Sequence, residues 1–164
     1  MNNLRRHDNL IMVQHTILDF IPNPKKIYYK ENGGFQIYYE YSLYVPLTPA
    51  SILTENDGWV TLYPDGRLTF LAYYAWNGPS VPFFIQINKD SMRPSLIHDG
   101  LYQLMRQGKL DRKRYRLWVD KLFRGHLLED GMSKTRAWMW YTAVRTFGSK
   151  SSQERSIRQI IQAP

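Results

Sequence analysis

The sequence changes character near residue 90, and this change limits the possible folds more than any other feature. Before it, short stretches rich in Tyr, Ile, Phe and Val are separated by turn residues, a pattern typical of strands. After it, apolar residues recur every three or four positions, a pattern typical of amphipathic helices. No apolar run approaches the ~18–20 residues that span a bilayer. The sequence therefore predicts an α+β fold, with a strand-rich N-terminal half packed on a helical C-terminal half.

Two β-hairpins are predicted in the first half of the chain. The first joins residues 26–30 to residues 35–45 through the turn Asn32-Gly33-Gly34. The second joins residues 59–63 to residues 68–71 through Pro64-Asp65-Gly66-Arg67. The remaining segments are expected to be loops over 46–57 and 74–90, and a stretch over 1–24 whose pattern suits either a strand or a short helix.

Three helices are predicted in the second half, each with a capping residue and an apolar stripe. Asp90 or Ser91 begins the first, which has Pro94 in its first turn and ends at Gly108. Asp111 begins the second, and Ser133 begins a third that closes at Gly148. The expected buried stripes are Ile97, Leu101, Leu104 and Met105; then Tyr115, Val119, Leu122 and Phe123; then Ala137, Trp140, Tyr141 and Val144. Residues 1–148 are expected to form one domain, followed by a basic tail over 149–164.

The 164-residue chain has a net charge of +8, and all of the excess lies in residues 101–164. A positive surface favours phosphate-bearing partners, either nucleic acid or an anionic membrane, although a solvated face explains the charge equally well. Five basic residues lie within Lys109–Arg116. Without a recognised reading motif, they predict non-specific electrostatic binding of nucleic acid at most. The sequence has no cysteine, which excludes disulfides, thiolate metal sites and cysteine nucleophiles.

Three polar features lie where the strand-rich half meets the helices. His98 and Asp99 are adjacent in the middle of the first predicted helix, and Asp120 is near the middle of the second. His98 lies about 10 residues before the connection 107–110 and Asp120 about 10 after it, so antiparallel packing brings them to equal height. A histidine oriented by a buried carboxylate is the arrangement that general-base catalysis uses.

The third feature is the loop Asn77-Gly78-Pro79-Ser80, where glycine lets the backbone approach a ligand closely. Each feature also has a purely structural explanation. A histidine in mid-helix is commonly a satisfied core residue, and the loop can simply turn the chain. Asp120 has Arg116 and Arg124 one turn away on either side, which suits a salt-bridged surface carboxylate.

The helical residues resemble two known families. Leu96–Tyr102 resembles the His-Asp-x-x-Tyr core of phospholipases A2, and Trp118–Phe123 resembles the Asp-x-x-Phe of their bacterial and parvoviral members. The segment Tyr74–Gly78 is similar in place to their calcium loop. The stretch from about 35 to 148 resembles a phage- and prophage-borne domain family of unknown function, through Asn77–Pro82, the same two helices and Tyr141–Gly148.

The first resemblance implies a calcium-dependent hydrolase of phospholipid esters. By that resemblance His98 is the general base and Asp120 its orienting partner, while Asp99 and the carbonyls around Trp76, Asn77 and Gly78 bind Ca²⁺. The Gly78 N–H would stabilise the oxyanion, and Tyr141 would help to orient the site. The expected partner is phospholipid or an anionic membrane surface. The second resemblance implies a phage protein, expected in the host cytoplasm or the virion. From the residues themselves, neither a signal peptide nor a transmembrane helix is expected, since polar residues such as Asp8, Gln14 and Asp19 interrupt the apolar stretch near the start.

Two alternatives remain open from the residues alone. The first is a non-catalytic phage structural or host-interaction protein, in which His98 and Asp120 hold two helices in register. Its binding surface would be formed by exposed aromatic residues among Tyr28, Tyr29, Tyr38, Tyr39 and Trp138. The second is a metal-dependent phosphohydrolase, which would use His15, His98, Asp99 and Asp120.

Overall fold

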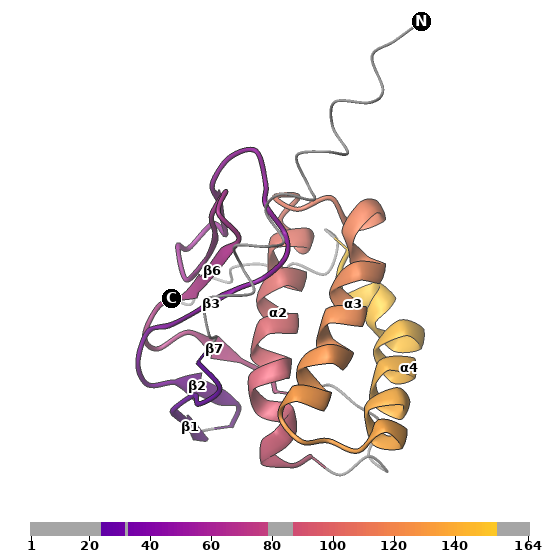
Figure 1. The fold of residues 1–164 in the computed structure, drawn as a ribbon. Helices are drawn as coiled ribbons and strands as arrows, with labels where there is room; N and C mark the ends of the chain where they lie inside the picture. Colours follow the sequence, from indigo (N-terminus) through magenta and orange to yellow (C-terminus); the bar gives the residue numbers. More distant parts are fainter. Residues whose placement is uncertain (1–23, 32, 79–86, 154–164) are drawn as a thin grey trace, which may run out of the picture.

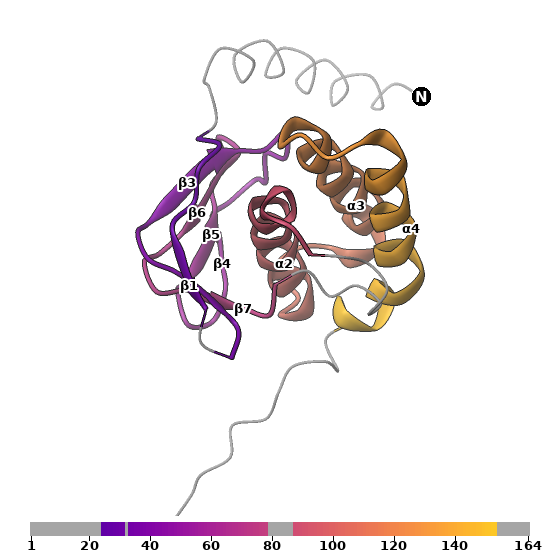
Figure 2. The same ribbon diagram turned by 90° about the horizontal axis from the view of Figure 1, so that it is seen from below.

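The computed structural model describes residues 24–31, 33–78 and 87–153. Helix α2 (Met92–Arg106) lies at the centre, between small β-sheets on one side and helices α3 (Arg112–Glu129) and α4 (Lys134–Ser151) on the other (Figures 1 and 2). This arrangement confirms the predicted α+β fold. The predictions for residues 1–23 and for the tail beyond residue 153 lie outside the described residues.

The strands form two separate antiparallel sheets. The first contains three short strands in the order β1 (Tyr29–Glu31), β2 (Phe35–Ile37) and β7 (Ala75–Trp76). The second contains four strands in the order β3 (Tyr41–Tyr44), β6 (Arg67–Phe70), β5 (Val60–Leu62) and β4 (Leu53–Thr54). Both predicted hairpins are present, since β1 pairs with β2 and β5 pairs with β6.

The strand prediction was wrong in two places. Residues 35–45 form two strands in different sheets, because the chain bends over residues 38–40 and leaves the first sheet for the second. The predicted loops 46–57 and 74–90 contain the short strands β4 and β7. Strands of two residues are too short to produce an alternating pattern, so the sequence gives no sign of them.

The three predicted helices are present, and two begin as expected. Asp111 accepts a hydrogen bond from Arg114 N at 3.1 Å, and Ser133 accepts one from Arg136 N at 3.4 Å. Ser91 precedes α2, but its hydroxyl donates to Asn88 O instead of capping the helix. Helix α4 was predicted to close at Gly148 but continues to Ser151. Gly148 lies inside the helix and against Tyr102, where a Cβ would be 3.1 Å from the hydroxyl oxygen.

The core surrounds α2, which is buried along most of its length. Its predicted stripe of Ile97, Leu101, Leu104 and Met105 is buried, and a Cβ added at Gly100 would lie 2.4 Å from the Phe70 ring of β6. The sheet side of α2 therefore packs closely enough to require glycine. A smaller core between α3 and α4 contains Phe123, Leu127, Met132, Ala137, Trp140, Ala143 and Val144. Within the described ranges, no helix is long and apolar enough to span a membrane.

Candidate functional site

Asp120 is the centre of a buried polar cluster that joins the three helices. Its side chain is 0% exposed, and its Oδ1 lies 2.9 Å from His98 Nε2 and accepts a hydrogen bond from the Tyr102 hydroxyl at 2.7 Å. Its Oδ2 accepts from Arg145 Nη1 at 2.7 Å. Because an ionised carboxylate only accepts hydrogen bonds, Nε2 of His98 carries the hydrogen of this contact. Asp120 is therefore buried and not a surface carboxylate, although Arg116, one of the two arginines considered as its salt-bridge partners, does lie near it.

The antiparallel packing of α2 and α3 produces this contact. Helix α2 ends at a tight connection in which Gly108 has a φ of +66°, a conformation that favours glycine. The chain then returns along α2, and Asp120 reaches the height of His98. The predicted equal height of these two residues is confirmed.

Arg116 connects the cluster to α4. Its Nε donates to the Tyr102 hydroxyl at 3.1 Å and lies 3.9 Å from Asp120 Oδ2. Its Nη2 donates to the backbone carbonyls of Val144 at 3.1 Å and Arg145 at 2.8 Å. One guanidinium group thus contacts all three helices, which restricts the position of Asp120 against His98.

The surroundings favour a charged pair at the centre of the site. Burial alone would lower the pKa of His98, but the hydrogen bond to Asp120 and the nearby Asp99 carboxylate outweigh burial and raise that pKa. Burial would raise the pKa of Asp120, but its bonds from His98, Tyr102 and Arg145 outweigh burial and lower it. Asp120 is therefore ionised at neutral pH and stabilises positive charge on the imidazole.

The other nitrogen of His98 faces the second acidic residue. Nδ1 lies 3.9 Å from Asp99 Oδ1, which is too far for a direct hydrogen bond. The imidazole ring is held between aromatic rings, with centroid distances of 4.1 Å to Tyr102 and 4.9 Å to Phe123. With hydrogen on Nε2, the neutral ring has a basic lone pair on Nδ1, the nitrogen directed toward Asp99.

Asp99 lies on the face of α2 that contacts the segment leading out of the second sheet. One turn before it, Ser95 Oγ accepts a hydrogen bond from Trp76 Nε1 at 3.1 Å. One turn after it, Gln103 Oε1 accepts one from the Tyr74 hydroxyl at 2.8 Å. Burial and the Asp99 carboxylate together raise the pKa of Tyr74. Asp99 therefore lies beside the segment in which the calcium loop was predicted.

The donor groups that were predicted around Asp99 match a hard cation in kind. A carboxylate and backbone carbonyls provide only oxygen, which Ca²⁺ prefers. Within residues 24–31, 33–78 and 87–153, no group of three or more His, Asp or Glu side chains is placed to hold a metal. Any cation here would depend on Asp99 and backbone carbonyls. The Trp76 carbonyl lies 3.5 Å from where a Cβ of Gly34 would be, on the β2 side.

The other predicted site residues are placed as follows. Gly78 has a φ of +74°, and a Cβ added there would lie 2.3 Å from the Phe35 ring, so only glycine suits this position. Tyr141 is half-buried on α4, and the tyrosine that contacts Asp120 is instead Tyr102. Pro79 and Ser80 of the predicted loop, and His15, lie outside the described residues.

Sequence reasoning did not assign site roles to Tyr102 and Arg145, and it considered Arg116 only as a salt-bridge partner of Asp120. Tyr102 is four residues after His98, and Arg116 is four residues before Asp120, so each lies on the same helix face as its neighbour. That spacing was a usable signal. Arg145 comes from α4, whose height relative to α3 follows from no spacing in the sequence.

The fold and the site define an α+β domain in which a histidine–carboxylate pair is buried between two antiparallel helices. Among known families, a DUF1353 domain, described as a protein of unknown function, is found at residues 69–144. This range contains His98, Tyr102, Arg116 and Asp120, and it ends one residue before Arg145. No curated protein and no solved structure matches the chain significantly.

Proposed function

We propose that this domain is a phage-encoded hydrolase with a phospholipase A2-like site, which cleaves phospholipid esters with water activated by His98. The observation that carries the proposal is the 2.9 Å contact between His98 Nε2 and the fully buried Asp120. This contact fixes the tautomer that makes Nδ1 basic. The Leu96–Tyr102 and Trp118–Phe123 segments supply the resemblance to phospholipases A2.

In the proposed reaction, Nδ1 of His98 takes a proton from water as the water oxygen attacks the ester carbonyl. The negative charge of Asp120 stabilises the imidazolium that forms. The tetrahedral intermediate then collapses, the ester C–O bond breaks, and the imidazolium returns its proton to the leaving alkoxide. The products are a carboxylic acid and an alcohol, and His98 is again neutral.

Asp99, with the carbonyls of Asn77 and Gly78, is the proposed place for Ca²⁺. Bound there, the cation would supply electrostatic stabilisation of the developing oxyanion. Asp99 would in either case orient polar groups near Nδ1, since its Oδ1 lies 3.9 Å from that nitrogen. The Gly78 N–H is the proposed backbone donor to the oxyanion.

The proposed partner is a phospholipid surface with anionic lipid. Lys113, Arg114 and Lys121 are exposed on α3, next to the helix face that carries Asp120 inward. Basic side chains within a Debye length of an anionic bilayer each contribute about 1 kcal/mol of attraction. They would bring the domain to the surface that contains its substrate.

A scaffold role for His98 and Asp120 is the main alternative, and the full set of hydrogen bonds on Asp120 supports it equally in structural terms. The metal-dependent phosphohydrolase is less well supported. Both oxygens of Asp120 already accept hydrogen bonds from His98, Tyr102 and Arg145, which leaves little capacity for a metal.

The experiment that tests the proposal is fatty-acid release from mixed phospholipid vesicles, with Ca²⁺ or with EDTA. His98→Asn should reduce release by at least about 100-fold while leaving the circular dichroism spectrum unchanged, because general-base catalysis contributes roughly 10²–10⁴-fold. His126→Gln is the matched control, since it changes a buried histidine outside the site and should preserve activity.

Two outcomes would overturn the hydrolase. One is no release from neutral and anionic vesicles at any Ca²⁺ concentration. The other is equal release by the wild type and His98→Asn. A loss of stability in His98→Asn, in a protein without activity, would instead establish the scaffold role.

A further inference from the structure

A groove of about 840 Å³ lies apart from the His98 site, where the β1–β2 hairpin meets the start of α2 and the end of α3. Its walls combine aromatic rings with basic side chains. The residues that matter for its chemistry are Lys25, Tyr28, Lys30, Tyr38, Tyr39 and Lys89.

The aromatic rings form a continuous series on the surface. Tyr28 contacts Tyr39 edge-to-face at a centroid distance of 5.7 Å, and Tyr39 contacts Tyr38 at 4.8 Å. Tyr38 in turn contacts Tyr73 at 6.2 Å. Tyr28 and Tyr39 are more than half exposed, so each ring has a face open to a ligand. A contiguous patch of exposed aromatic rings is unusual on a surface that has no binding role.

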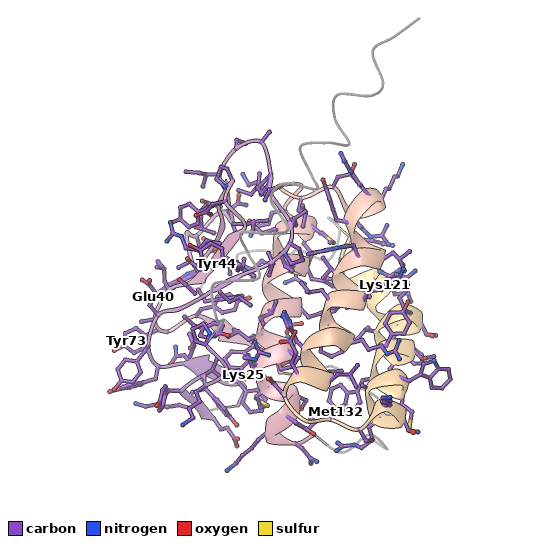
Figure 3. The ribbon with its side chains drawn as sticks, viewed as in Figure 1. Lys25, Glu40, Tyr44, Tyr73, Lys121 and Met132 are labelled. Carbon is purple, nitrogen blue, oxygen red and sulfur yellow. The ribbon has the colours of Figure 1, made fainter. Side chains whose placement is uncertain are left out.

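Tyr73 is held in a backbone conformation that tyrosine rarely adopts. Its φ is +72°, the left-handed region, and it is the one non-glycine residue with a positive φ in the described part of the chain. The ring is 56% exposed and points away from the helices at the outer edge of the strands (Figure 3). A glycine at this position would relieve the backbone strain. The free-energy cost of placing a tyrosine here is not compensated by burial of its ring, because the ring is exposed.

The lysines of the groove give it a positive potential. Within the described ranges, Lys25, Lys26, Lys30 and Lys89 form no ion pair, and Lys30 Nζ lies 4.6 Å from the centre of the Tyr38 ring. The acids in the groove are already paired. Glu129 and Asp130 bind Arg93, at 3.1 and 2.7 Å. Asp90 binds Arg136 at 3.5 Å.

We propose that this groove binds single-stranded nucleic acid without sequence specificity, by stacking bases on its tyrosine rings and pairing phosphates with its lysines. Alternating aromatic faces and unpaired cations are the two features that single strands require. A duplex keeps its bases stacked internally and cannot use the rings. A bilayer surface does not enter a concave groove. The proposal depends on no residue of the His98 site.

The test is fluorescence anisotropy of a labelled oligo-dT strand at low salt, compared with a duplex of equal length. Tyr39→Ala should weaken binding about fivefold or more, because stacking is worth roughly 1–3 kcal/mol per base. Tyr73 does not line the groove, but its ring contacts Tyr38, so Tyr73→Gly should weaken binding less than Tyr39→Ala does. Its melting temperature should stay equal or rise because the backbone strain is removed. This pair of results would separate loss of a binding ring from loss of the fold.

A charge-matched pair of variants tests the lysines. Replacing Lys25, Lys26 and Lys30 by Gln should lower the slope of log affinity against log salt by roughly 2, about 0.7 for each phosphate that is no longer neutralised. Replacing Lys109, Lys113 and Lys121 by Gln removes the same charge on the helical side, where Lys121 lies across the molecule from Tyr73 (Figure 3), and should leave most of the affinity intact. His98→Asn should bind the strand as the wild type does.

Four outcomes would overturn this proposal. They are no binding of the strand, tighter binding of the duplex, tighter binding of polyglutamate than of the strand, and an equal loss of affinity in the two lysine variants.

Discussion

Helices α2 and α3 each contain one buried histidine, and the surroundings shift the pKa values of the two histidines in opposite directions. His98 of α2 contacts the Asp120 carboxylate of α3, which raises its pKa despite burial. His126 of α3 is also buried, but the arginine that reaches it from α2 is Arg93, whose charge adds to the effect of burial. The pKa of His126 is therefore lowered to about 4.

The partners of each histidine explain the difference. The Asp120 carboxylate lies within hydrogen-bond distance of His98. On the side of His126, the carboxylates of Glu129 and Asp130 are instead bound by Arg93. Nδ1 of His126 has no hydrogen-bond partner among the described residues. A buried imidazole is thus prepared to carry charge in one cluster and to remain neutral in the other. Only the first arrangement is useful for proton transfer.

The largest expected effect is at Asp120. Asp120→Ala would leave His98, Arg116 and Arg145 without their buried counter-charge, so the free energy of unfolding should fall by about 3–5 kcal/mol. Urea denaturation at pH 7 measures it. Asp120→Asn keeps the shape and most hydrogen bonds, and should cost clearly less. Equal and small losses in both variants would mean that the cluster does not depend on the charge of Asp120.

The second expected effect is on pH dependence. Because His126 has a folded pKa of about 4 against an ordinary 6.5, its neutral form stabilises the protein fully above pH 6.5. That contribution of about 3 kcal/mol should be lost as the pH falls from 6.5 to 4. His126→Leu should flatten the curve of unfolding free energy against pH in this range, measured by urea denaturation at several pH values.

The contribution of His98 to the free energy of unfolding should depend on pH in the opposite direction. The folded pKa of His98 is raised, so its contribution is fully present below pH 6.5 and is lost as the pH rises through the folded pKa.

For the His126→Leu variant, an unchanged slope of unfolding free energy against pH in acid would show that groups other than His126 destabilise the protein there.

The smallest expected effects concern two helical glycines, each next to one of the clusters. A Cβ at Gly100 would lie 2.4 Å from the Phe70 ring, so Gly100→Ala should destabilise the protein by about 1–3 kcal/mol. A Cβ at Gly125 would meet nothing within 4 Å, so Gly125→Ala should stabilise α3 by about 0.5–1 kcal/mol. Thermal and urea unfolding of the two variants should differ in sign. Two shifts in the same direction would contradict the packing described around α2.

The sequence predicted the part of the site that follows from helix geometry. Equal spacing from the connection 107–110 was sufficient to pair His98 with Asp120. Helix spacing was insufficient to place Arg145. The position of Arg145 depends on the height of α4 relative to α3, which packing at Phe123 and Trp140 determines. Tyr141 was predicted to help orient the site, but the tyrosine that contacts Asp120 is Tyr102, whose four-residue spacing from His98 places both on one helix face.

The sheets were less predictable than the helices. A break after Ile37 sends the chain from one sheet to the other, yet residues 35–45 read as one aromatic-rich strand. The exposed Tyr38 and Tyr39 occupy this break, where strand preference and surface position conflict. The strand-like composition there reflects rings on the surface, not a buried strand.

The guanidinium group of Arg116 bonds to the two other helices at once. By binding the Tyr102 hydroxyl of α2 and two main-chain carbonyls of α4 from its place on α3, it links the helices at a single point. Helix α4 cannot separate from the bundle without exposing that point to water. The amides around the site should therefore exchange with solvent through one shared cooperative opening, not helix by helix.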